Sequence, residues 1–492
     1  MRPLVTPPSA AFADSRLTRA EDSYRQARLA HWDAVARRLE GWSGLGAGYQ
    51  RRLIETYRFL VPPGRRILEL GCGTGDLLAA LDPHFGVGVD FSSEMILRAR
   101  AQHPRLTFVV GDVHNLDLGE RFDVIILSDL LNDLWDVQVV LERLQRLTHA
   151  GSRVIMNFYS RLWAFPLAVA QKLRLAKPVL TQNWLTREDV GDLLHLADFE
   201  VLRSFQDVLW PLPTPLLSAA ANRFLVKLWP FRHLALTNFL VARPRGRTGT
   251  GSGEPIVSVI IPARNEAGNI EGLLARVPEM GAGTEIIFVE GHSDDDTYGA
   301  IENAMARHPE RRCQLHRQAG KGKGDAVRLG FAKATGDVLM ILDADLTVPP
   351  EDLPRFYEAL RTLKGDFING VRLVYPMEAE AMRFPNFLAN KFFSIAFTFL
   401  LGQPVKDTLC GTKVLWKKDY EKIASDRAYF GDFDPFGDFD LLFGAAKQGL
   451  KMIDLPIRYR QRTYGTTNIS RWRHGVLLLR MAAFAAYRIK FV

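Results

Sequence analysis

Hydrophobic residues in this chain come mostly in short runs that end at an acidic residue or a glycine. The clearest run is Val338-Leu-Met-Ile-Leu342, which leads directly into Asp343-Ala-Asp345. Five consecutive apolar residues predict a buried strand. Because side chains alternate along an extended backbone, Asp343 and Asp345 point to the same side and can converge on one cation. Open α/β sheets bind ligands at the carboxyl ends of their strands, so this pair is a candidate metal site. The simpler interpretation is a solvated acidic turn.

The first half of the chain repeats this pattern several times. Helical periodicity covers residues 14–60, with a glycine-rich break at 44–48. Strands are then predicted at residues 66–70, 85–89, 106–110 and 122–127. A glycine or an acidic residue follows each of them. Regular alternation of strand and helix predicts a parallel sheet that binds a nucleoside.

The turn after the first of these strands is rich in glycine. It reads Glu69-Leu-Gly71-Cys-Gly73-Thr-Gly75, and a helix is predicted to start near Asp76. Glycines at alternate positions allow a sharp turn against which a ligand can lie, next to the N-terminus of the helix. Asp90 ends the next strand, where a carboxylate can accept hydrogen bonds from ribose hydroxyls.

These motifs resemble the class I S-adenosylmethionine-dependent methyltransferases. The resemblance implies S-adenosylmethionine as cofactor and a seven-stranded Rossmann-like sheet over residues 50–243, with later strands near 153–157, 199–202 and 236–241. The pattern GxGxG lacks the later glycine of the dinucleotide-binding GxGxxG, which argues against a dehydrogenase. The cofactor-binding residues that it implies are Glu69, Gly71, Gly73, Gly75, Asp90 and Asp112.

The methyl acceptor leaves no comparable motif. After the fourth strand, Asp129 is either a base or a helix cap. A domain that binds the cofactor without catalysing methyl transfer therefore stays open as an alternative. An apolar, aromatic insertion at residues 210–231 is interpreted as a lid or substrate wall packed into the domain, with a membrane-touching surface as the alternative.

A polar, glycine-rich segment separates the two halves of the chain. Residues 244–254 are predicted to be a flexible linker between a domain at 1–243 and a second domain at 255–492. The second half again starts with a buried strand, which ends in Pro262 and is followed by Glu266. Another strand at 285–289 leads into Glu290.

A second glycine loop, Gly320-Lys-Gly-Lys323-Gly, precedes a predicted helix. Lysines beside a helix N-terminus form an anion site through both their charge and the helix dipole, although they can also be simply solvated. With the Asp343-Ala-Asp345 motif, these features resemble the family-2 glycosyltransferases of the GT-A fold over residues 255–468. The resemblance implies Mg²⁺ or Mn²⁺ on Asp343 and Asp345. It also implies a nucleotide-diphospho-sugar donor bound by Pro262, Glu266, Glu290, Lys323 and Asp343.

Later segments of this domain resemble dolichyl-phosphate mannose synthase and its bacterial polyprenyl-phosphate relatives. The segments are Gly370–Arg372, Asp407–Lys413, Leu455–Ile457 and Arg462–Asn468. The resemblance implies that Arg372 and Arg462 act at the acceptor and donor phosphates. The chain departs from this subgroup at Asn468, where a lysine is common, and at Thr347, where a glutamine can help to hold the metal.

An acid-rich segment at 430–440 provides candidate catalytic bases. Asp438 or Asp440 would act as a base if the acceptor were a glycan hydroxyl, whereas a polyprenyl phosphate is already an anionic nucleophile and needs none. A loop whose phenylalanines pack while its aspartates cap a helix is the structural alternative. Both acceptors therefore stay open.

The composition of the chain bears on its partners and its location in the cell. The net charge of +8 suits anionic partners such as nucleotide diphosphates or phospholipid surfaces, and no nucleic-acid partner is expected. Three scattered cysteines form neither a disulfide framework nor a zinc site, which predicts a cytoplasmic location. Neither a signal peptide nor a spanning helix is predicted. Short apolar stretches at 386–401 and 476–486, with Arg and Trp nearby, suit the membrane interface or a protein core. We therefore expect peripheral contact with the inner face of the membrane.

Overall fold

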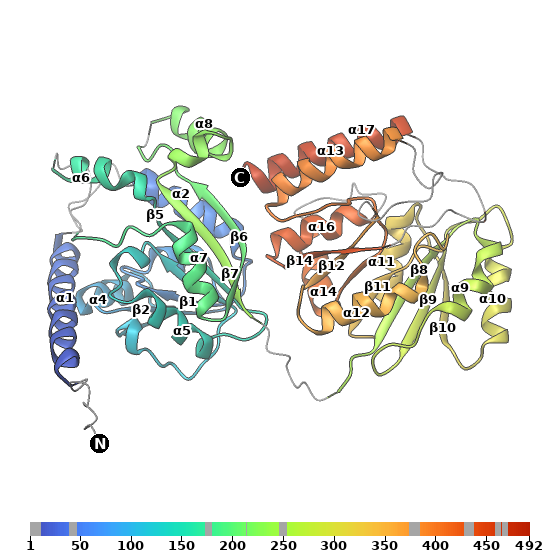
Figure 1. Ribbon diagram of the computed structural model, residues 1–492, viewed down its shortest axis with the longest axis horizontal. Helices are drawn as coiled ribbons and strands as arrows, with labels where there is room; N and C mark the ends of the chain where they lie inside the picture. Colours follow the sequence, from blue (N-terminus) through green and yellow to red (C-terminus); the bar gives the residue numbers. More distant parts are fainter. Residues whose placement is uncertain are drawn as a thin grey trace, which may run out of the picture. The chain divides into compact units, whose positions relative to one another are not determined.

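The chain folds into two compact α/β units, Met1–Arg245 and Gly246–Val492. The division falls inside the predicted linker at 244–254. Each unit contains one seven-stranded mixed sheet with helices packed on it (Figure 1). The predicted two-domain α/β fold is therefore confirmed. The computed structural model describes residues 11–38, 47–172, 180–212, 214–245, 253–372, 384–427, 437–457, 464 and 471–492.

The sheet of the first unit has the strand order β3-β2-β1-β4-β5-β7-β6. β7 is antiparallel to both of its neighbours, and the other neighbouring pairs are parallel. The carboxyl ends of β1 to β6 consequently lie along one edge of the sheet. The strands are β1 (Arg66–Leu70), β2 (Phe85–Asp90), β3 (Thr107–Val110), β4 (Val124–Ser128), β5 (Arg153–Tyr159), β6 (Phe199–Asp207) and β7 (Thr237–Pro244).

Helices cover both faces of this sheet. Alternate residues of a strand face opposite sides, so Ile67 packs against α2, α3 and α4, whereas Leu68 belongs to the cluster formed with α5 and α7. The α-helices are α1 (Ala11–Arg38), α2 (Ala47–Leu60), α3 (Asp76–Ala80), α4 (Ser93–Gln102), α5 (Val137–Leu147), α6 (Ala164–Lys172), α7 (Arg187–Leu196) and α8 (Leu217–Arg223). Short 3₁₀ turns are η2 (Val113–Asn115), η3 (Leu131–Asp133), η4 (Arg161–Trp163), η5 (Leu225–Lys227) and η6 (Phe231–Leu234).

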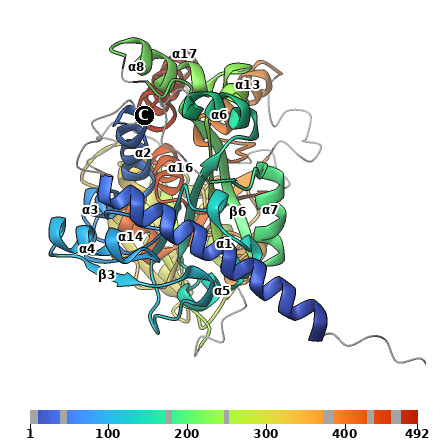
Figure 2. The same ribbon diagram turned by 90° about the vertical axis from the view of Figure 1, so that its left-hand side faces the viewer.

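The long helix α1 packs beside α4 (Figure 2). Its hydrophobic periodicity suggests a buried face that includes Ala27, but Ala27 is exposed and the neighbouring Arg28 is buried. The guanidinium of Arg28 donates to the carbonyl of Thr181 at 2.5 Å and lies 3.5 Å from the ring centroid of Tyr24. The helix lies on polar loops at the edge of the sheet, so its contact face carries charge.

The sheet of the second unit has the order β10-β9-β8-β11-β13-β12-β14, and β13 is antiparallel to both neighbours. β11 is the predicted buried strand before Asp343, and its four residues are fully buried. Its end lies beside the ends of β8 and β9. The strands are β8 (Val257–Ala263), β9 (Thr284–Glu290), β10 (Arg312–Arg317), β11 (Val338–Ile341), β12 (Phe367–Val371), β13 (Lys413–Trp416) and β14 (Met452–Pro456).

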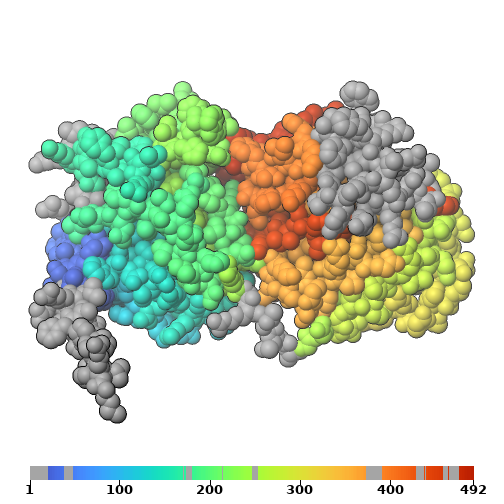
Figure 3. Space-filling model, in the orientation of Figure 1, coloured from blue at the N-terminus to red at the C-terminus, as the bar shows by residue number. Residues whose placement is uncertain are grey.

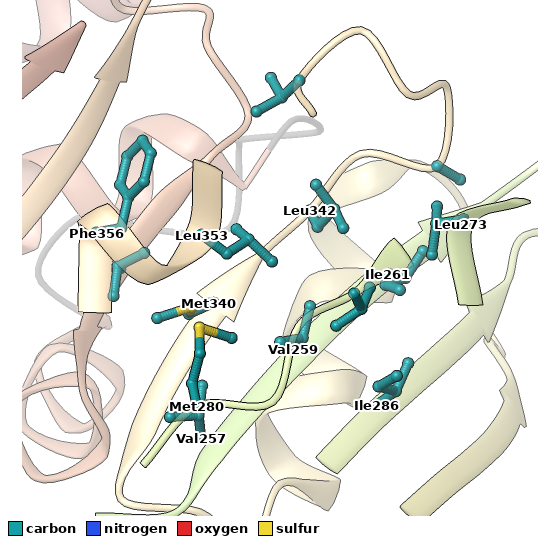
Figure 4. Close-up of a cluster of buried hydrophobic side chains, with 14 of the residues drawn as sticks. Val257, Val259, Ile261, Leu273, Met280, Ile286, Met340, Leu342, Leu353 and Phe356 are labelled. Carbon is teal, nitrogen blue, oxygen red and sulfur yellow. The ribbon is translucent and has the colours of Figure 1, made fainter. Parts of the chain in front are cut away.

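The core of this unit is a layer of hydrophobic side chains between the sheet and three helices, α9, α10 and α12. Figure 4 shows Val259 and Met340 on the strands facing Leu353 and Phe356 of α12. On the opposite face, α11 lies so close to β8 that a side chain at Gly330 would collide with Ile260. The helices are α9 (Ile270–Arg276), α10 (Thr297–Arg307), α11 (Lys323–Lys333), α12 (Leu353–Arg361), α13 (Phe384–Leu401), α14 (Lys417–Ser425), α16 (Asp438–Lys447) and α17 (Arg471–Ala485). Short helices are η7 (Ala267–Asn269), η8 (Pro350–Asp352) and the π-helix η9 (Ala486–Lys490).

The apolar helices α13 and α17 lie side by side (Figures 1 and 2). Phe443 of α16 links them, because its ring centroid is 5.7 Å from that of Phe397 and 6.4 Å from that of Phe484. Other large side chains of this helix pair point outward, among them Phe392, Ile395 and Leu479. In the part of the chain that the structure describes, no helix has the length and apolar character required to cross a bilayer.

Candidate active sites

A cavity lies at the carboxyl edge of the first sheet, where the glycine-rich turn was expected to bind a cofactor. Four of the six predicted cofactor-binding residues line it, namely Gly71, Gly73, Asp90 and Asp112. One wall comes from α1 and includes Tyr24, Arg25, Arg28 and Trp32. The contribution of α1 was missed, because a helix that precedes the sheet carries no cofactor motif.

The glycine turn has a backbone that requires glycine. Gly71, Gly73 and Gly75 have φ angles of 69°, 53° and 77°, in the left-handed region. A Cβ on Gly71 would lie 2.8 Å from the side chain of Leu130, and one on Gly75 would lie 2.6 Å from Phe108. Gly75 precedes the first turn of α3 and packs on Phe108, whereas Gly71 and Gly73 face the cavity.

Asp90 is the acid expected to bind the ribose. Its Oδ2 accepts a hydrogen bond from the Gly73 amide at 2.9 Å, and its Oδ1 accepts one from the Ser92 amide at 2.9 Å. Burial raises the pKa of Asp90, although these amide donors oppose the shift. A carboxylate oxygen can accept more than one hydrogen bond, so a carboxylate that borders the cavity fits a ribose diol.

Glu69 lies behind the turn and is not among the residues that line the cavity. Its Oε2 accepts a hydrogen bond from the Leu78 amide of α3 at 3.0 Å. Burial raises the pKa of Glu69 to about 8, so the carboxyl group carries a proton at neutral pH. This geometry orients the start of α3 and supports the turn from behind.

Asp112, another of the expected cofactor-binding residues, is already engaged within the protein. Its Oδ1 accepts hydrogen bonds from the backbone amide of His114 at 2.9 Å and lies 2.8 Å from Nδ1 of the same residue. Its Oδ2 forms an ion pair with Arg25 of α1. Burial opposes ionisation, but His114 and Arg25 together lower the pKa of Asp112 to about 2. A cofactor group that binds Asp112 would therefore share this carboxylate with Arg25 of α1.

A buried polar cluster surrounds Asp129 at the end of β4, where the sequence left a choice between a base and a helix cap. Oδ1 of Asp129 accepts hydrogen bonds from the Tyr49 hydroxyl at 2.8 Å and from Nδ2 of Asn157 at 2.6 Å. The hydroxyl of Tyr57 donates to Oδ1 of Asn157 at 2.7 Å. Burial raises the pKa of Asp129 to about 7, and its φ of 53° is left-handed. Asp129 lines the cavity, and its carboxyl group can exchange a proton near neutral pH.

In the second unit, the predicted donor-site residues gather at one edge of the sheet. Asp343 follows β11, Arg372 follows β12, and Lys413 begins the antiparallel strand β13. Nζ of Lys323, at the start of α11, lies 2.5 Å from Oδ1 of Asp343. The site therefore combines a carboxylate with three cations that the chain supplies from separate segments.

The charges of these cations act on Asp343. Burial opposes its ionisation, but Lys323, and then Lys413 and Arg372, lower the pKa of Asp343 below its ordinary range. Lys413 is fully buried, and its Nζ donates to the carbonyl of Cys410 at 2.5 Å. The sequence marked Lys413 only as part of a motif, because nothing in the pattern shows that a lysine starts a buried strand beside the acids.

Arg372 is held rigidly by Asp407. Its Nε and Nη2 donate to the two carboxylate oxygens of Asp407 at 2.7 and 2.9 Å. Asp407 has no exposed surface; burial opposes its ionisation, but Arg372 holds its pKa far below the ordinary value. Such a bidentate pair fixes the guanidinium in one orientation, which suits recognition of a phosphate.

Asp345 is oriented by the residue that replaces the expected glutamine. Its Oδ1 accepts hydrogen bonds from the amide of Thr347 at 3.1 Å and from the hydroxyl of Thr347 at 2.7 Å. Within the described ranges, no group of three His, Cys, Asp or Glu residues comes together in a way that could hold a metal ion. Two carboxylates nevertheless fit Mg²⁺, which is commonly held by one or two carboxylates with substrate phosphates and water.

The other predicted donor-site residues border the loops after β8 and β9. Pro262 is the second-last residue of β8. Oε2 of Glu266 accepts a hydrogen bond from Nδ2 of Asn269 at 2.7 Å. The carboxylate of Glu290 accepts from the Ser293 amide at 2.6 Å and from Nε of Arg317 at 3.1 Å. Burial opposes its ionisation, but these donors lower the pKa of Glu290. Both acids thus order the loops that follow β8 and β9.

The structure describes the candidate catalytic residues Asp438, Asp440 and Arg462 to different extents. Asp438 begins α16, but the structure does not describe its side chain. The preceding residue, Gly437, faces the backbone of Gly324 in the glycine loop. Asp440 is 6% exposed, and its Oδ2 lies 3.7 Å from nitrogens of both Arg328 and Arg427. Arg462 lies outside the described residues.

Comparisons with known protein families agree with this division of the chain. The model of a methyltransferase domain matches residues 62–199, and the model of glycosyl transferase family 2 matches residues 258–424. The chain joins a methyltransferase domain to a family 2 glycosyltransferase domain. In the glycosyltransferase domain, the chain is 30% identical to dolichol-phosphate mannosyltransferase of Pyrococcus furiosus over 219 residues, which are 43% of this chain and 59% of that protein. It is 38% identical to the Saccharomyces cerevisiae dolichol-phosphate mannosyltransferase over 108 residues, which are 21% of this chain and 40% of that protein.

A third relative is the polyprenol monophosphomannose synthase of Mycolicibacterium smegmatis, with 26% identity over 43% of this chain and 80% of that protein. Among solved structures, the methyltransferase domain is similar to magnesium protoporphyrin IX methyltransferase from Synechocystis, with 20% identity and a TM-score of 0.32 over 46% of this chain and 99% of that chain. A methyltransferase from Mesorhizobium loti matches with 21% identity and a TM-score of 0.31 over 38% of this chain and 96% of that chain.

Proposed function

We propose that the protein is a bifunctional transferase. Its glycosyltransferase domain moves a sugar from a nucleotide-diphospho-sugar to a polyprenyl phosphate, and its methyltransferase domain moves a methyl group from S-adenosylmethionine to a separate acceptor. The observation that carries the proposal is the cluster of Lys323, Arg372 and Lys413 around Asp343. A cation cluster at the carboxyl edge of a sheet suits a diphosphate leaving group.

In the proposed sugar transfer, an acceptor phosphate oxygen attacks the anomeric carbon of the sugar, and the bond from that carbon to the nucleoside diphosphate breaks. Lys323 and Arg372 would stabilise the charge that develops on the leaving diphosphate. Asp343 and Asp345 would hold Mg²⁺ or Mn²⁺, which supplies further neutralisation of the same charge. Glu266 and Glu290 would keep the nucleotide-side loops in place.

A phosphate acceptor is favoured over a glycan hydroxyl by the surroundings of Asp440. A hydroxyl acceptor requires a base, but Asp440 lies between Arg328 and Arg427. Both guanidinium groups form ion pairs with this carboxylate, which fits a structural partner of two cations. The relatives named above act on dolichol phosphate or polyprenol phosphate by their names.

The outer face of α13 and α17 supports an acceptor that lies in a membrane. Phe392 is 61% exposed, Ile395 is 72% exposed and Leu479 is 56% exposed. Apolar side chains on a surface helix can enter the interface of a bilayer without crossing it. We propose peripheral attachment of the glycosyltransferase domain through this face.

The decisive experiment offers labelled nucleotide-sugars to the purified full-length protein with a short polyprenyl phosphate in detergent. We expect label in the organic phase, and none with the matching polyprenol that lacks the phosphate. Label found solely on water-soluble glycans would overturn the phosphate acceptor and favour the glycan alternative.

The methyltransferase activity needs a separate test. The left-handed glycine turn, Asp90 and the cavity support binding of S-adenosylmethionine, and Asp129 supports a proton-accepting role at the acceptor side. We expect transfer of labelled methyl from S-adenosylmethionine when lipid and glycan extracts are offered as acceptors. Measurable cofactor binding without any transfer would instead favour a domain that binds the cofactor but does not catalyse.

A further inference from the structure

The methyltransferase domain exposes many large apolar side chains in two segments that follow the carboxyl ends of β5 and β6. Figure 3 shows atoms of both segments, in teal green and light green, on the surface of this domain. The most exposed are Leu216 at 87%, Phe165 at 78% and Trp229 at 74%. They belong to two segments, η4–α6 after β5 and the connection from β6 to β7 that contains α8, η5 and η6. We name this the edge surface, and it comprises Leu162, Phe165, Val169, Leu216, Leu217, Phe224, Leu225, Leu228, Trp229, Phe231 and Leu234.

The second segment was expected to pack into the domain as a lid or substrate wall. For most of its large side chains that prediction is wrong, because they face outward. The segment is nevertheless well anchored. Val226 is fully buried, and the side chain of Asn222 accepts from the Trp210 amide and donates to the Trp210 carbonyl, both at 2.8 Å. The exposed side chains therefore project from an ordered scaffold.

Hydrogen bonds join the two segments into one surface. Nε1 of Trp163 donates to the carbonyl of Leu234 at 2.9 Å. The amide of Ser160 donates to the carbonyl of Leu236 at 2.7 Å. Figures 1 and 2 both show α6 and α8 at the same end of this domain. The edge surface is therefore continuous across segments that are far apart in the sequence.

The charge of the edge surface is positive. The sequence contains no Asp or Glu from residue 143 to 187 or from 208 to 253. Arg161, Lys172 and Arg232 are exposed within the two segments. Lys227 is a separate case, because its Nζ forms an ion pair with the buried Asp207 at 3.2 Å. Apolar and aromatic side chains with basic residues among them, and no acids, match the composition that binds anionic membrane interfaces.

We propose that the edge surface docks the methyltransferase domain on an anionic lipid bilayer. This contact is distinct from the lipid contact proposed for α13 and α17, which belong to the other domain. Apolar side chains would enter the acyl boundary while the basic side chains meet lipid phosphates. The edge surface lies at the same sheet edge as Asp90 and Asp129, so docking would face the cofactor cavity toward acceptors that reside in the membrane. That last consequence rests on the proposed methyltransferase function.

The test requires a local readout, because the other domain can also bind lipid. Hydrogen–deuterium exchange of the full-length protein is compared without lipid, with phosphatidylcholine vesicles, and with vesicles of equal parts phosphatidylcholine and phosphatidylglycerol. We expect slower exchange at residues 160–172 and 214–236 with the anionic vesicles only, reversed by high salt. No protection of these segments would overturn the proposal, as would equal protection by neutral vesicles or protection without lipid, which would indicate a second copy of the chain.

Substitutions test whether lipid binding depends on the edge surface or on exposed apolar side chains anywhere on the domain. The variant Phe165→Ser/Leu216→Ser/Trp229→Ser is compared with Leu97→Ser/Leu196→Ser, whose side chains are 62% and 63% exposed on α4 and α7 of the same domain. The triple variant should weaken binding to anionic vesicles on the order of tenfold or more and lose the local protection, whereas the double variant should keep both. Equal losses in the two variants would contradict the proposal. Retained binding of S-adenosylmethionine shows that the domain is folded and keeps this result independent of the proposed catalysis.

Discussion

Nζ of Lys323 lies 2.5 Å from Oδ1 of Asp343, so the lysine of the glycine loop contacts the first carboxylate of the Asp-Ala-Asp motif directly. The two residues meet because α11 begins at the sheet edge where β11 ends. The sequence presented them as an anion site and a metal site. In the structure they form one site, in which the lysine can serve both the carboxylate and a bound diphosphate.

Replacing Lys323 should therefore disable sugar transfer. We expect Lys323→Met to lower kcat/KM for the nucleotide-sugar roughly a hundredfold or more, because the leaving diphosphate loses a fixed cation. Lys321→Met is the control, since Lys321 is an exposed lysine in the same loop. Similar losses in the two variants would indicate that the loop acts through its net charge alone.

Gly411 should be intolerant of any side chain. A Cβ at this position would collide with Oδ2 of Asp343 and with Nζ of Lys323. We expect Gly411→Ala to lower glycosyl transfer on the order of tenfold or more by displacing this pair, with little change in thermal stability. Gly272→Ala on α9 is the matched control, because its Cβ would meet nothing within 4 Å. Full activity of Gly411→Ala would show that the observed pairing is not needed for catalysis.

Sugar transfer should depend on a divalent cation. We expect chelation to abolish it and Mg²⁺ or Mn²⁺ to restore it, because a diphosphate leaving group needs neutralisation. Asp345→Asn should reduce activity roughly a hundredfold while an amide oxygen preserves the hydrogen bonds from Thr347. Circular dichroism checks that this variant folds. Undiminished activity in excess chelator would refute the metal site.

Binding of S-adenosylmethionine should depend on Asp90. We expect Asp90→Ala to weaken binding by about 1–3 kcal/mol in calorimetry, because two ribose hydroxyls lose their acceptor. Asp76→Ala provides a control in the adjacent turn, where the side chain of Asp76 is 65% exposed. Binding of NAD in place of S-adenosylmethionine would contradict the assignment of this cavity.

The stability of the methyltransferase domain should fall as the pH rises from about 4 to about 7. Burial raises the pKa of Asp129 to about 7, so in this window the folded chain binds a proton that the unfolded chain has released. Asp129→Asn removes the ionising group. The free energy of unfolding of this variant, relative to that of the native protein, should therefore be higher at pH 8 than at pH 5 by on the order of a few kcal/mol. Thermal denaturation at both pH values measures the difference. Asp192→Asn, at an exposed position of α7, should show no such pH dependence.

The sequence alone determined the two domains, their sheets and most of the cofactor and donor motifs. Runs such as 338–342 and 257–261 are short and mostly apolar, which predicts buried strands. The glycines at 71, 73 and 75 allow a turn that other residues resist. These signals are local: each depends on a few consecutive residues. For that reason the strand positions and the glycine turn could be predicted from the sequence alone.

The tertiary structure decided which groups act on one another. Arg25 reaches Asp112, and Tyr49 and Asn157 meet at Asp129. The charge of Lys413 lowers the pKa of Asp343. Nothing near any of these residues in the sequence marks these interactions. The outward direction of Trp229 and Leu216 is likewise invisible in an apolar sequence, which suits a packed lid and an interfacial surface equally well. Burial, pKa and pairing depend on atoms brought together from distant segments, and only the folded chain brings them together.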